Sequence, residues 1–337
     1  MRGRTVKIGL FLLLIVAAFA AAYGSADIPL SNVVRILLST LGVGDVSDLP
    51  QNDINIILDL RSPRVVLLTL VGGALAISGA ALQAIFQNPM ADPGVLGVTG
   101  GGAFGAVLSI YLGFTDVVPL ALPFFALAGA LASSFLVYLL AHIGGRPTTT
   151  TLLLTGIAIG TLTAAGMGFL LAGTDEYRVK QVFFWLIGGA EARTWNHVLL
   201  ATPFIFIGTS ILLFASRPID ILSLGEDHAL SVGVAVGPMR MLLLFACAVA
   251  ASAAVSACGS IAFVGLIIPH AIRYLVGARS RTLLPACFLG GGAFLVLCDL
   301  AARVAPFKTE LHLGVLTAFL GVPFLLFLMI RAKRISN

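Results

Sequence analysis

The fold is decided around one short polar stretch, Ser223-Leu-Gly-Glu-Asp-His-Ala-Leu-Ser-Val-Gly233, in an otherwise apolar chain. Ser223 and Glu226 have the spacing of a capping box, and Gly233 suits a left-handed helix stop. Glu226 and Asp227 fall in the first turn, where carboxylates favour the positive end of the helix dipole. The pattern predicts a helix of about nine residues, ~13 Å long and too short to cross a bilayer. We expect it at a membrane surface, either as a contact for another protein or as a solvated connector.

The composition around this stretch is that of a polytopic membrane protein. Of the 337 residues, 59% are hydrophobic and only 10% are charged, and the mean hydropathy is +1.06. Soluble domains are about a quarter charged. The pI near 9.3 therefore does not require a nucleic-acid partner. The four cysteines lie in apolar runs without metal or redox spacing, which predicts buried, inert thiols.

Ten apolar segments are visible, and most hold the ~20 residues that a membrane helix needs. Pro269 interrupts the eighth, which is short, and the part of 173–195 around 181–187 adds a short surface helix. The N-terminal run up to residue 23 is similar to a secretory signal, but the many spans that follow favour an uncleaved first helix. The segments are 8–25, 63–85, 94–112, 119–141, 151–172, 196–215, 239–258, 261–276, 283–302 and 312–330.

An even number of spans places both termini on one side of the membrane. That side then carries 12 of the 20 basic residues but only 4 of the 15 acidic ones. The positive-inside rule makes this side cytoplasmic, together with the polar loop at about 216–238. We therefore predict an all-α polytopic protein of about ten transmembrane helices, both termini cytoplasmic, in one transmembrane domain over 1–337.

Small residues predict where the helices meet, and missing motifs narrow the function. Glycines in 72–79, 100–105, 156–160 and 290–292 allow close approach of helix backbones. No phosphate-binding loop with its lysine is present. We therefore expect that this chain has no ATPase site of its own, is not an enzyme and binds no cofactor.

Several motifs in fixed order carry a resemblance that covers nearly the whole length. The chain resembles the FecCD-type permeases, the type II family of ATP-driven importers for iron–siderophores, haem and cobalamin. The resemblance implies ten helices, a homodimer, two cytoplasmic ATPase subunits that bind ATP and Mg²⁺, and a soluble substrate-binding protein outside. The motifs are Arg61-Ser-Pro-Arg64, the run 72–83, Asn88-Pro-Met-Ala-Asp-Pro-Gly94-Val-Leu-Gly97, Trp185-Leu-Ile-Gly-Gly189, Leu224-Gly-Glu226, Gly265-Leu-Ile-Ile-Pro-His270, Asp299-Leu-Ala-Ala-Arg303 and Gly314-Val-Leu-Thr-Ala-Phe-Leu-Gly-Val-Pro323.

The resemblance gives the polar loop and the outer arginines their expected roles. It implies that the loop with Ser223, Gly225, Glu226, Asp227 and Gly233 contacts the ATPase. It also implies that three arginines at the outer ends of spans pair with acidic residues of the binding protein, which a guanidinium grips with two parallel bonds. Their alternative role is anchoring at lipid headgroups. The outer arginines are Arg61, Arg64 and Arg303.

Two polar positions at the cytoplasmic side resemble the pore gates of the family. They are Asn88 with Met90, and Thr149 with Thr150. Ordinary turn formation and helix initiation are the alternatives for them. The five histidines lie far apart without ligand spacing, so no metal site is expected. Asp299 is the main acid inside the membrane, and an ion pair with Arg303, one helical turn away, would satisfy it.

The predicted function is that of a permease which moves a bulky metal chelate from a binding protein to the cytoplasm. An iron chelate, siderophore or haem, is the first choice and cobalamin the second. An ion-coupled secondary transporter is the alternative from another class; it would need charged groups at mid-membrane and often inverted repeats, and neither is evident. The expected location is the bacterial cytoplasmic (inner) membrane, and the lipid bilayer is a further partner.

Overall fold

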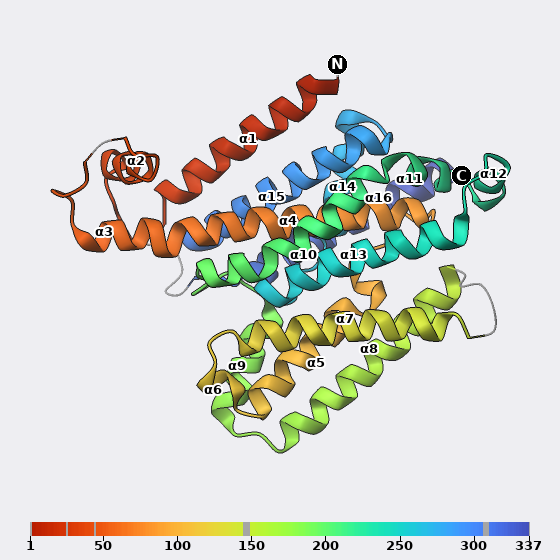
Figure 1. Cartoon of the computed structure of the whole chain (residues 1–337), viewed down its shortest axis with the longest axis horizontal. Helices are drawn as coiled ribbons and strands as arrows, with labels where there is room; N and C mark the ends of the chain where they lie inside the picture. The colour runs from red at the N-terminus through yellow and green to blue at the C-terminus, as the bar shows by residue number, and fades with distance from the viewer. Residues whose placement is uncertain (1, 25, 44, 144–148, 306–309, 337) are drawn as a thin grey trace.

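The computed structural model describes residues 2–24, 26–43, 45–143, 149–305 and 310–336, and all regular structure in them is helical (Figure 1). Two short helices form the polar loop and separate the long helices on either side of it. The elements are α1 (Arg2–Ala22), α2 (Leu30–Ser39), α3 (Gln51–Asn55), the π-helix η1 (Ile56–Arg61), α4 (Ser62–Ile85), the 3₁₀ helix η2 (Pro93–Leu96), α5 (Val98–Tyr111), α6 (Phe114–Val117), α7 (Ala121–Ala141), α8 (Thr149–Ala172), α9 (Glu176–Ile187), α10 (Trp195–Phe214), α11 (Ser216–Leu222), α12 (Glu226–Ser231), α13 (Val236–Cys258), α14 (Val264–Val276), α15 (Ser280–Val304) and α16 (Leu313–Ser336).

Each of the ten predicted apolar segments forms a helix. Six helices within the described residues are long and apolar enough to cross a membrane, and the other predicted segments form shorter apolar helices. The eighth segment is α14, with 13 residues and Pro269 inside, as predicted. The six long helices are Gln51–Ile85, Ala121–Ala141, Thr150–Ala172, Trp195–Phe214, Val236–Cys258 and Ser280–Val304.

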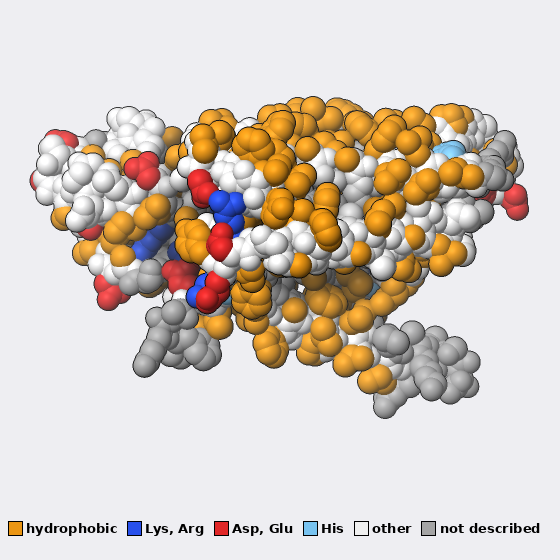
Figure 2. Space-filling view, turned by 90° about the horizontal axis from the view of Figure 1, so that it is seen from below, with side chains coloured by type: hydrophobic (Ala, Val, Ile, Leu, Met, Phe, Trp, Pro, Cys, Tyr) orange, Lys and Arg blue, Asp and Glu red, His pale blue; other side chains and the backbone are white. Residues whose placement is uncertain are grey.

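The helices run broadly along one axis, which gives the molecule two ends. We call one the α12 end, because α11, α12, the start of α1 and the end of α16 lie toward it (Figure 1). The other is the α2 end, which also holds α3 and α6. Figure 2 shows apolar side chains over the middle of one face, with acidic and basic side chains gathered at the α2 end. An apolar surface between polar ends is the pattern of a chain that spans a bilayer.

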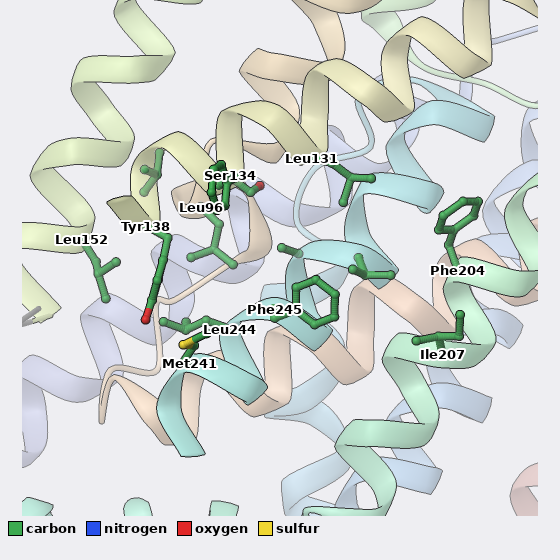
Figure 3. Close-up of a pocket in the computed structure, with 14 residues that line it drawn as sticks. Leu96, Leu131, Ser134, Tyr138, Leu152, Phe204, Ile207, Met241, Leu244 and Phe245 are labelled. Carbon is green, nitrogen blue, oxygen red and sulfur yellow. The ribbon is translucent and has the colours of Figure 1, made fainter. Parts of the chain in front are cut away.

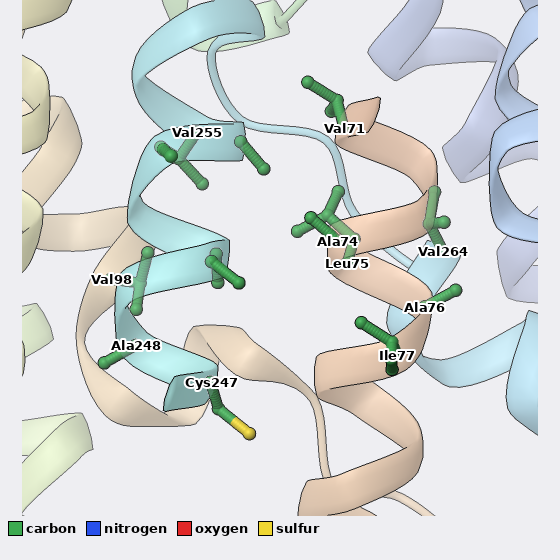
Figure 4. Packing of buried hydrophobic residues seen from close by; sticks show 14 of the residues in the cluster. Val71, Ala74, Leu75, Ala76, Ile77, Val98, Cys247, Ala248, Val255 and Val264 are labelled. Carbon is green, nitrogen blue, oxygen red and sulfur yellow. The ribbon is translucent and has the colours of Figure 1, made fainter. Parts of the chain in front are cut away.

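Helix α4 forms the centre of the core. It packs against α15, α13, α14 and α10, and Figure 4 shows its small side chains facing those of α13. A Cβ added at Gly72 would overlap the Gly291 carbonyl on α15, and one at Gly79 would overlap the Gly265 backbone on α14. The predicted use of glycine for close helix contact is confirmed at these positions.

A second group consists of α5, α7, α8 and α9, which lie together below the core in the view of Figure 1. Gly101 and Gly105 of α5 contact the α7 backbone closely. The predicted short helix in 173–195 is α9, and the Asp175 side chain caps it by accepting a hydrogen bond of 3.0 Å from the Arg178 N–H. A Cβ at Gly160 of α8 would meet nothing within 4 Å, so that glycine is not a close contact on its open side.

The α2 end contains structure that the hydropathy pattern did not predict. Helix α2 buries Val33 and Ile36 against Ile57 of η1 in a separate small cluster. The loop after α2 is held by Arg35, whose Nη2 lies 2.6 Å from Asp48 Oδ1, and this hydrogen bond lowers the pKa of the Asp48 carboxyl. Ten amphipathic residues give too weak a hydropathy signal to indicate a span, so α2 was not predicted.

Candidate functional site

The polar loop forms two short helices, and its capping differs from the prediction. Helix α12 starts at Glu226, with Gly225 at the N-cap position in a backbone conformation of φ +114°. Ser223 does not cap it: its Oγ donates to the Asp220 carbonyl at 2.7 Å and belongs to the end of α11. The predicted capping box is therefore wrong, because a helix that already ends at Ser223 uses that hydroxyl. The stop at Gly233 is confirmed by its φ of +81° and by the Val234 N–H donating to the Ala229 carbonyl.

Helix α12 attaches to the protein by a small contact and exposes the rest of its surface. Ala229 is its one buried residue. Glu226 Oε2 lies 3.5 Å from Arg240 Nη2 on α13. Large apolar side chains around it are more than half exposed, which is costly unless another surface covers them. They are Leu224, Leu230 and Val232.

Helix α11 connects this loop to the core through polar contacts that the sequence analysis did not find. The Asp220 carboxylate accepts a hydrogen bond of 2.7 Å from the Ser280 N–H, at the first residue of α15. Gln87, just beyond α4, donates to the Leu222 carbonyl at 3.3 Å. The loop is therefore held by the end of the α4 segment and by the start of α15. Asp220 and Ser280 are 60 positions apart, so no local sequence signal marks this contact.

At the α2 end, a cluster of charged residues joins α4 to α15. Arg64 Nε donates to Asp299 Oδ1 at 2.9 Å, and both of its terminal nitrogens lie 3.1 Å from Glu310 Oε2. Asp299 is fully buried, and Arg303 Nε lies 3.0 Å from its second oxygen without the alignment of a hydrogen bond. The predicted ion pair of Asp299 with Arg303 is confirmed, and Arg64 completes it.

Arg61 and Arg303 donate hydrogen bonds to the carbonyls at the end of α1. Arg61 donates to the carbonyls of Ala21 and Ala22 at 3.0 and 2.7 Å, and Arg303 donates to those of Ala20 and Tyr23, each at 3.0 Å. The last carbonyls of a helix lack partners within the helix, and cations there favour the negative end of its dipole. Both arginines are more than nine-tenths buried. Both arginines therefore have partners inside the protein, which their predicted roles in docking or headgroup anchoring did not include.

A polar cavity of about 260 Å³ opens beside these groups. Its charged lining consists of four arginines and one glutamate, so a positive charge remains in excess. Glu310 and Arg193 were not among the predicted site residues. The charged lining residues are Arg61, Arg64, Arg193, Arg303 and Glu310.

The predicted gate positions lie at the α12 end. Asn88 Oδ1 accepts a hydrogen bond of 2.9 Å from the Met90 N–H, so the turn formation considered for this residue is present. Met90 is 38% exposed. Thr149 begins α8, but its side chain lies outside the described residues, and Thr150 is exposed. Asn88, Met90 and Thr150 are not buried, so these three side chains are accessible to a ligand or to another chain.

The cysteines and the possible metal ligands are the remaining reactive side chains. The four cysteines are free and buried, as predicted. Within the part of the chain that the structure describes, no group of three or more His, Cys, Asp or Glu residues could hold a metal ion.

The family of this chain follows from its similarity to known proteins. The sequence profile of the FecCD transport family matches residues 12–331. The chain belongs to the FecCD transport family. FecCD proteins similar to it are permease subunits of ABC importers, so this FecCD chain is an ABC importer permease with several apolar membrane helices.

Relatives of this FecCD chain are named for different cargoes. It is 44% identical over 80% of its length to the cobalamin import permease BtuC of Halobacterium salinarum, covering 72% of that protein. It is 37% identical to the hemin transport permease HmuU of Yersinia pestis, over 82% of this chain and 83% of the relative. The uncharacterized ABC transporter permease YvrB of Bacillus subtilis is 36% identical over 97% of this chain and 93% of its own.

A solved structure has the same fold over nearly the whole FecCD chain. It is described as an inward-facing conformation of a metal-chelate type ABC transporter. Its TM-score is 0.84 at 30% identity, and the match covers 98% of this chain and 99% of the other. The shared fold and the family together establish the permease class.

Proposed function

We propose that this permease moves a bulky metal chelate from a substrate-binding protein into the cytoplasm, driven by ATP and Mg²⁺ on separate ATPase subunits. The observation that carries the proposal is the family match over 12–331, joined to a loop at the α12 end that exposes an apolar, uncovered surface. Members of the family partner with ATPases and binding proteins. Iron chelates, siderophore or haem, and cobalamin are the candidate cargoes.

We further propose that all ten apolar helices cross the bilayer, within one permease domain over 1–337. Both termini and α12 then lie in the cytoplasm of a bacterial cell, and the protein sits in the inner membrane. The positive-inside distribution of charge supports this orientation. The permease would act as a homodimer, for which the exposed apolar side chains of α8 offer a surface. Ser280 is buried, so the exposed Ser231 at the end of α12 is the test position on the cytoplasmic side. A cysteine at Ser47 and another at Ser231 should react from opposite sides of the membrane, and reaction from one side rejects the span count.

Coupling to the ATPase is assigned to the loop around α12. Glu226 and Asp227 place carboxylates at the start of this helix, while Leu224, Leu230 and Val232 expose apolar surface for a partner. Glu226→Arg puts a cation at a helix N-terminus and removes the pair with Arg240. This variant should weaken co-purification of the ATPase and abolish the stimulation of ATP hydrolysis by the permease. Glu176→Arg, an exposed glutamate in the first turn of α9, is the matched control and should have neither effect; equal effects would reject the coupling role.

Docking of the binding protein is assigned to the cavity lined by Arg61, Arg64 and Arg303. An incoming carboxylate must share Arg64 with Glu310, so Glu310→Gln should speed association and steepen its salt dependence. Asp59→Asn removes one exposed acidic charge at the same end without lining the cavity. We expect a larger gain for Glu310→Gln than for Asp59→Asn, measured as association rates across a salt series. Equal gains would mean that only overall charge acts and that the cavity is not the docking site.

The gate role is assigned to Asn88, Met90, Thr149 and Thr150, which lie where the pathway would open to the cytoplasm. The neutral character of these side chains suits passage of a large ligand without tight binding. Thr150→Cys, in a background without native cysteines, should react with a bulky thiol reagent from the α12 side and lose transport. Full transport after complete modification would remove Thr150 from the pathway.

Cargo is the part of the proposal that uptake decides. The 44% identity to a permease named for cobalamin favours cobalamin, and the 37% relative named for hemin supports haem. The permease, its ATPase and its binding protein are reconstituted in liposomes, and uptake of cobalamin, haem and ferric siderophores is followed by their distinct visible spectra. Uptake should require ATP and survive collapse of ion gradients. Uptake driven by an ion gradient without ATP would instead support the secondary transporter.

A further inference from the structure

A large apolar groove lies between the two groups of helices. It has a volume of about 500 Å³, and Figure 3 shows the side chains of α7, α10 and α13 that surround it. All three helices are among the six long enough to cross a membrane. The polar groups of its lining are the hydroxyls of Ser134 and Tyr138. Lining residues that the argument uses are Leu131, Tyr138, Phe204, Met241, Leu244 and Phe245.

The groove continues into a second cavity at the α12 end. The two share Tyr138, Met241 and Leu244 as lining residues, and the second has a volume of about 680 Å³. Its lining contains Arg240 and His142. The imidazole of His142 contacts the Tyr138 ring in a tilted arrangement, with centroids 4.1 Å apart and 56° between the ring planes. An apolar channel therefore ends at an opening that holds the Arg240 guanidinium, the Glu226 carboxylate and the His142 ring.

The distance along this channel fits one leaflet of a bilayer. On α13 the lining runs from Val236 to Val249, and an acyl chain below the Arg240 guanidinium would follow the part between Arg240 and Val249. Nine residues of helix span ~13.5 Å. Half of a bilayer's hydrocarbon core is about 15 Å thick. A molecule whose polar group lies beside Arg240 would thus have its apolar part within the hydrocarbon depth of the leaflet.

We propose that this groove binds a glycerophospholipid, with an acyl chain between α7, α10 and α13 and its phosphate beside Arg240. The apolar lining matches an acyl chain, and a guanidinium at headgroup depth matches a phosphate, whether the headgroup is zwitterionic or anionic. Filling the groove replaces an empty apolar cavity by packed hydrocarbon, which restores dispersion contacts to its walls. The binding depends only on the membrane position of these helices and not on the cargo.

The headgroup position links this lipid to α12. Arg240 Nη2 lies 3.5 Å from Glu226 Oε2, and Glu226 also lines the second cavity. A phosphate beside Arg240 competes with Glu226 for the same guanidinium. Lipid occupancy therefore acts on the carboxylate at the start of the helix that is assigned to ATPase contact.

The test uses Phe245→Trp as a reporter within the groove, in full-length protein reconstituted in nanodiscs of non-brominated phosphatidylcholine. Acyl-brominated phosphatidylglycerol and acyl-brominated diacylglycerol are added, and quenching of tryptophan fluorescence beyond that of the wild type is recorded. We expect phosphatidylglycerol to reach half-quenching at about fivefold lower mole fraction, as one arginine near a charged lipid contributes. Arg240→Gln should abolish this preference. Arg279→Gln, an exposed arginine at the same end that lines neither cavity, should keep it.

A second reporter separates the groove from the general lipid shell. Phe206→Trp on α10 is 68% exposed and does not line the groove, so both lipids should quench it equally in every variant. Absence of quenching at Phe245→Trp would mean that protein covers the groove, and the proposal would fail. It would also fail if the phosphatidylglycerol preference were unchanged in Arg240→Gln. Neither result bears on transport, so the function proposed above would stand.

Discussion

Helices α4 and α8 are both apolar and both 24 residues long, yet their surroundings are opposite. In the most apolar 18-residue window, 83% of residues are buried for the helix ending in α4 and 17% for α8. Helix α4 is enclosed by α10, α13, α14 and α15, whereas α8 lies at the edge of the second helix group. Two helices that are both apolar enough to span a membrane thus have different surroundings: protein for α4, and lipid or another protein for α8.

The difference teaches that close packing, rather than apolar character, defines the core of this permease. Lipid is as apolar as leucine, so burying a side chain in protein gains mainly packing contacts and polar pairs. Helix α4 has both, through its glycine contacts and through Arg64. Substitutions that remove these contacts should therefore be costly on α4 and its neighbours and nearly silent on α8.

The largest difference is expected where a buried charge loses its partners. Asp299→Ala leaves Arg64 and Arg303 beside each other in a buried site next to α4, at a cost of about 3–5 kcal/mol. Asp175→Ala, at the N-cap of α9 just after α8, removes an exposed cap and should cost only ~1 kcal/mol. The free energies of unfolding come from denaturant titrations in mixed micelles. Similar losses for the two variants would show that the cluster adds no more to stability than a surface cap.

Removal of a large side chain should give the next difference. Leu67 on α4 is fully buried, and Leu67→Ala should cost about 2–4 kcal/mol through the cavity it leaves. Leu162 on α8 is 64% exposed, and Leu162→Ala should change stability by less than about 0.5 kcal/mol. The same titrations give both numbers. A cost at Leu162 that grows with protein concentration would place a second copy against α8, whereas a large cost independent of concentration would contradict the comparison.

The smallest difference concerns an added methyl group. Gly79→Ala on α4 pushes a Cβ into the Gly265 backbone of α14, and overpacking of this kind costs about 1–3 kcal/mol. Gly160→Ala on α8 meets open space and should raise helix stability by up to ~1 kcal/mol. Thermal midpoints of both variants in one detergent measure the two signs. A loss at Gly160 as large as that at Gly79 would mean that its open side is covered in the assembly.

Much of the fold could be predicted because its signals are local. Each of the ten apolar runs became a helix, α14 is short with Pro269 inside it, and Gly233 stopped α12. The amphipathic helix α2 was missed, because ten residues of mixed character carry little hydropathy signal. The capping box was wrong, because Ser223 already ends α11.

The candidate site was found in part, for the same reason. Motifs located Arg61, Arg64 and Arg303, and the one-turn spacing gave the pair of Asp299 with Arg303. Their remaining partners come from distant parts of the chain, such as the carbonyls at the end of α1 and Glu310. The link from Asp220 to the start of α15 is of the same kind.

The sequence by itself determined the membrane class, the helical segments and the family. Composition, hydropathy and motif order can all be read along the chain without knowledge of which distant residues meet. Only the tertiary structure decided that α4 is central and α8 peripheral, since both have the apolar composition of a membrane span. It also decided that the three motif arginines are held by internal partners, and that α7, α10 and α13 enclose a groove. Contacts between residues 40 to 280 positions apart depend on how whole helices pack, and no local pattern contains that information.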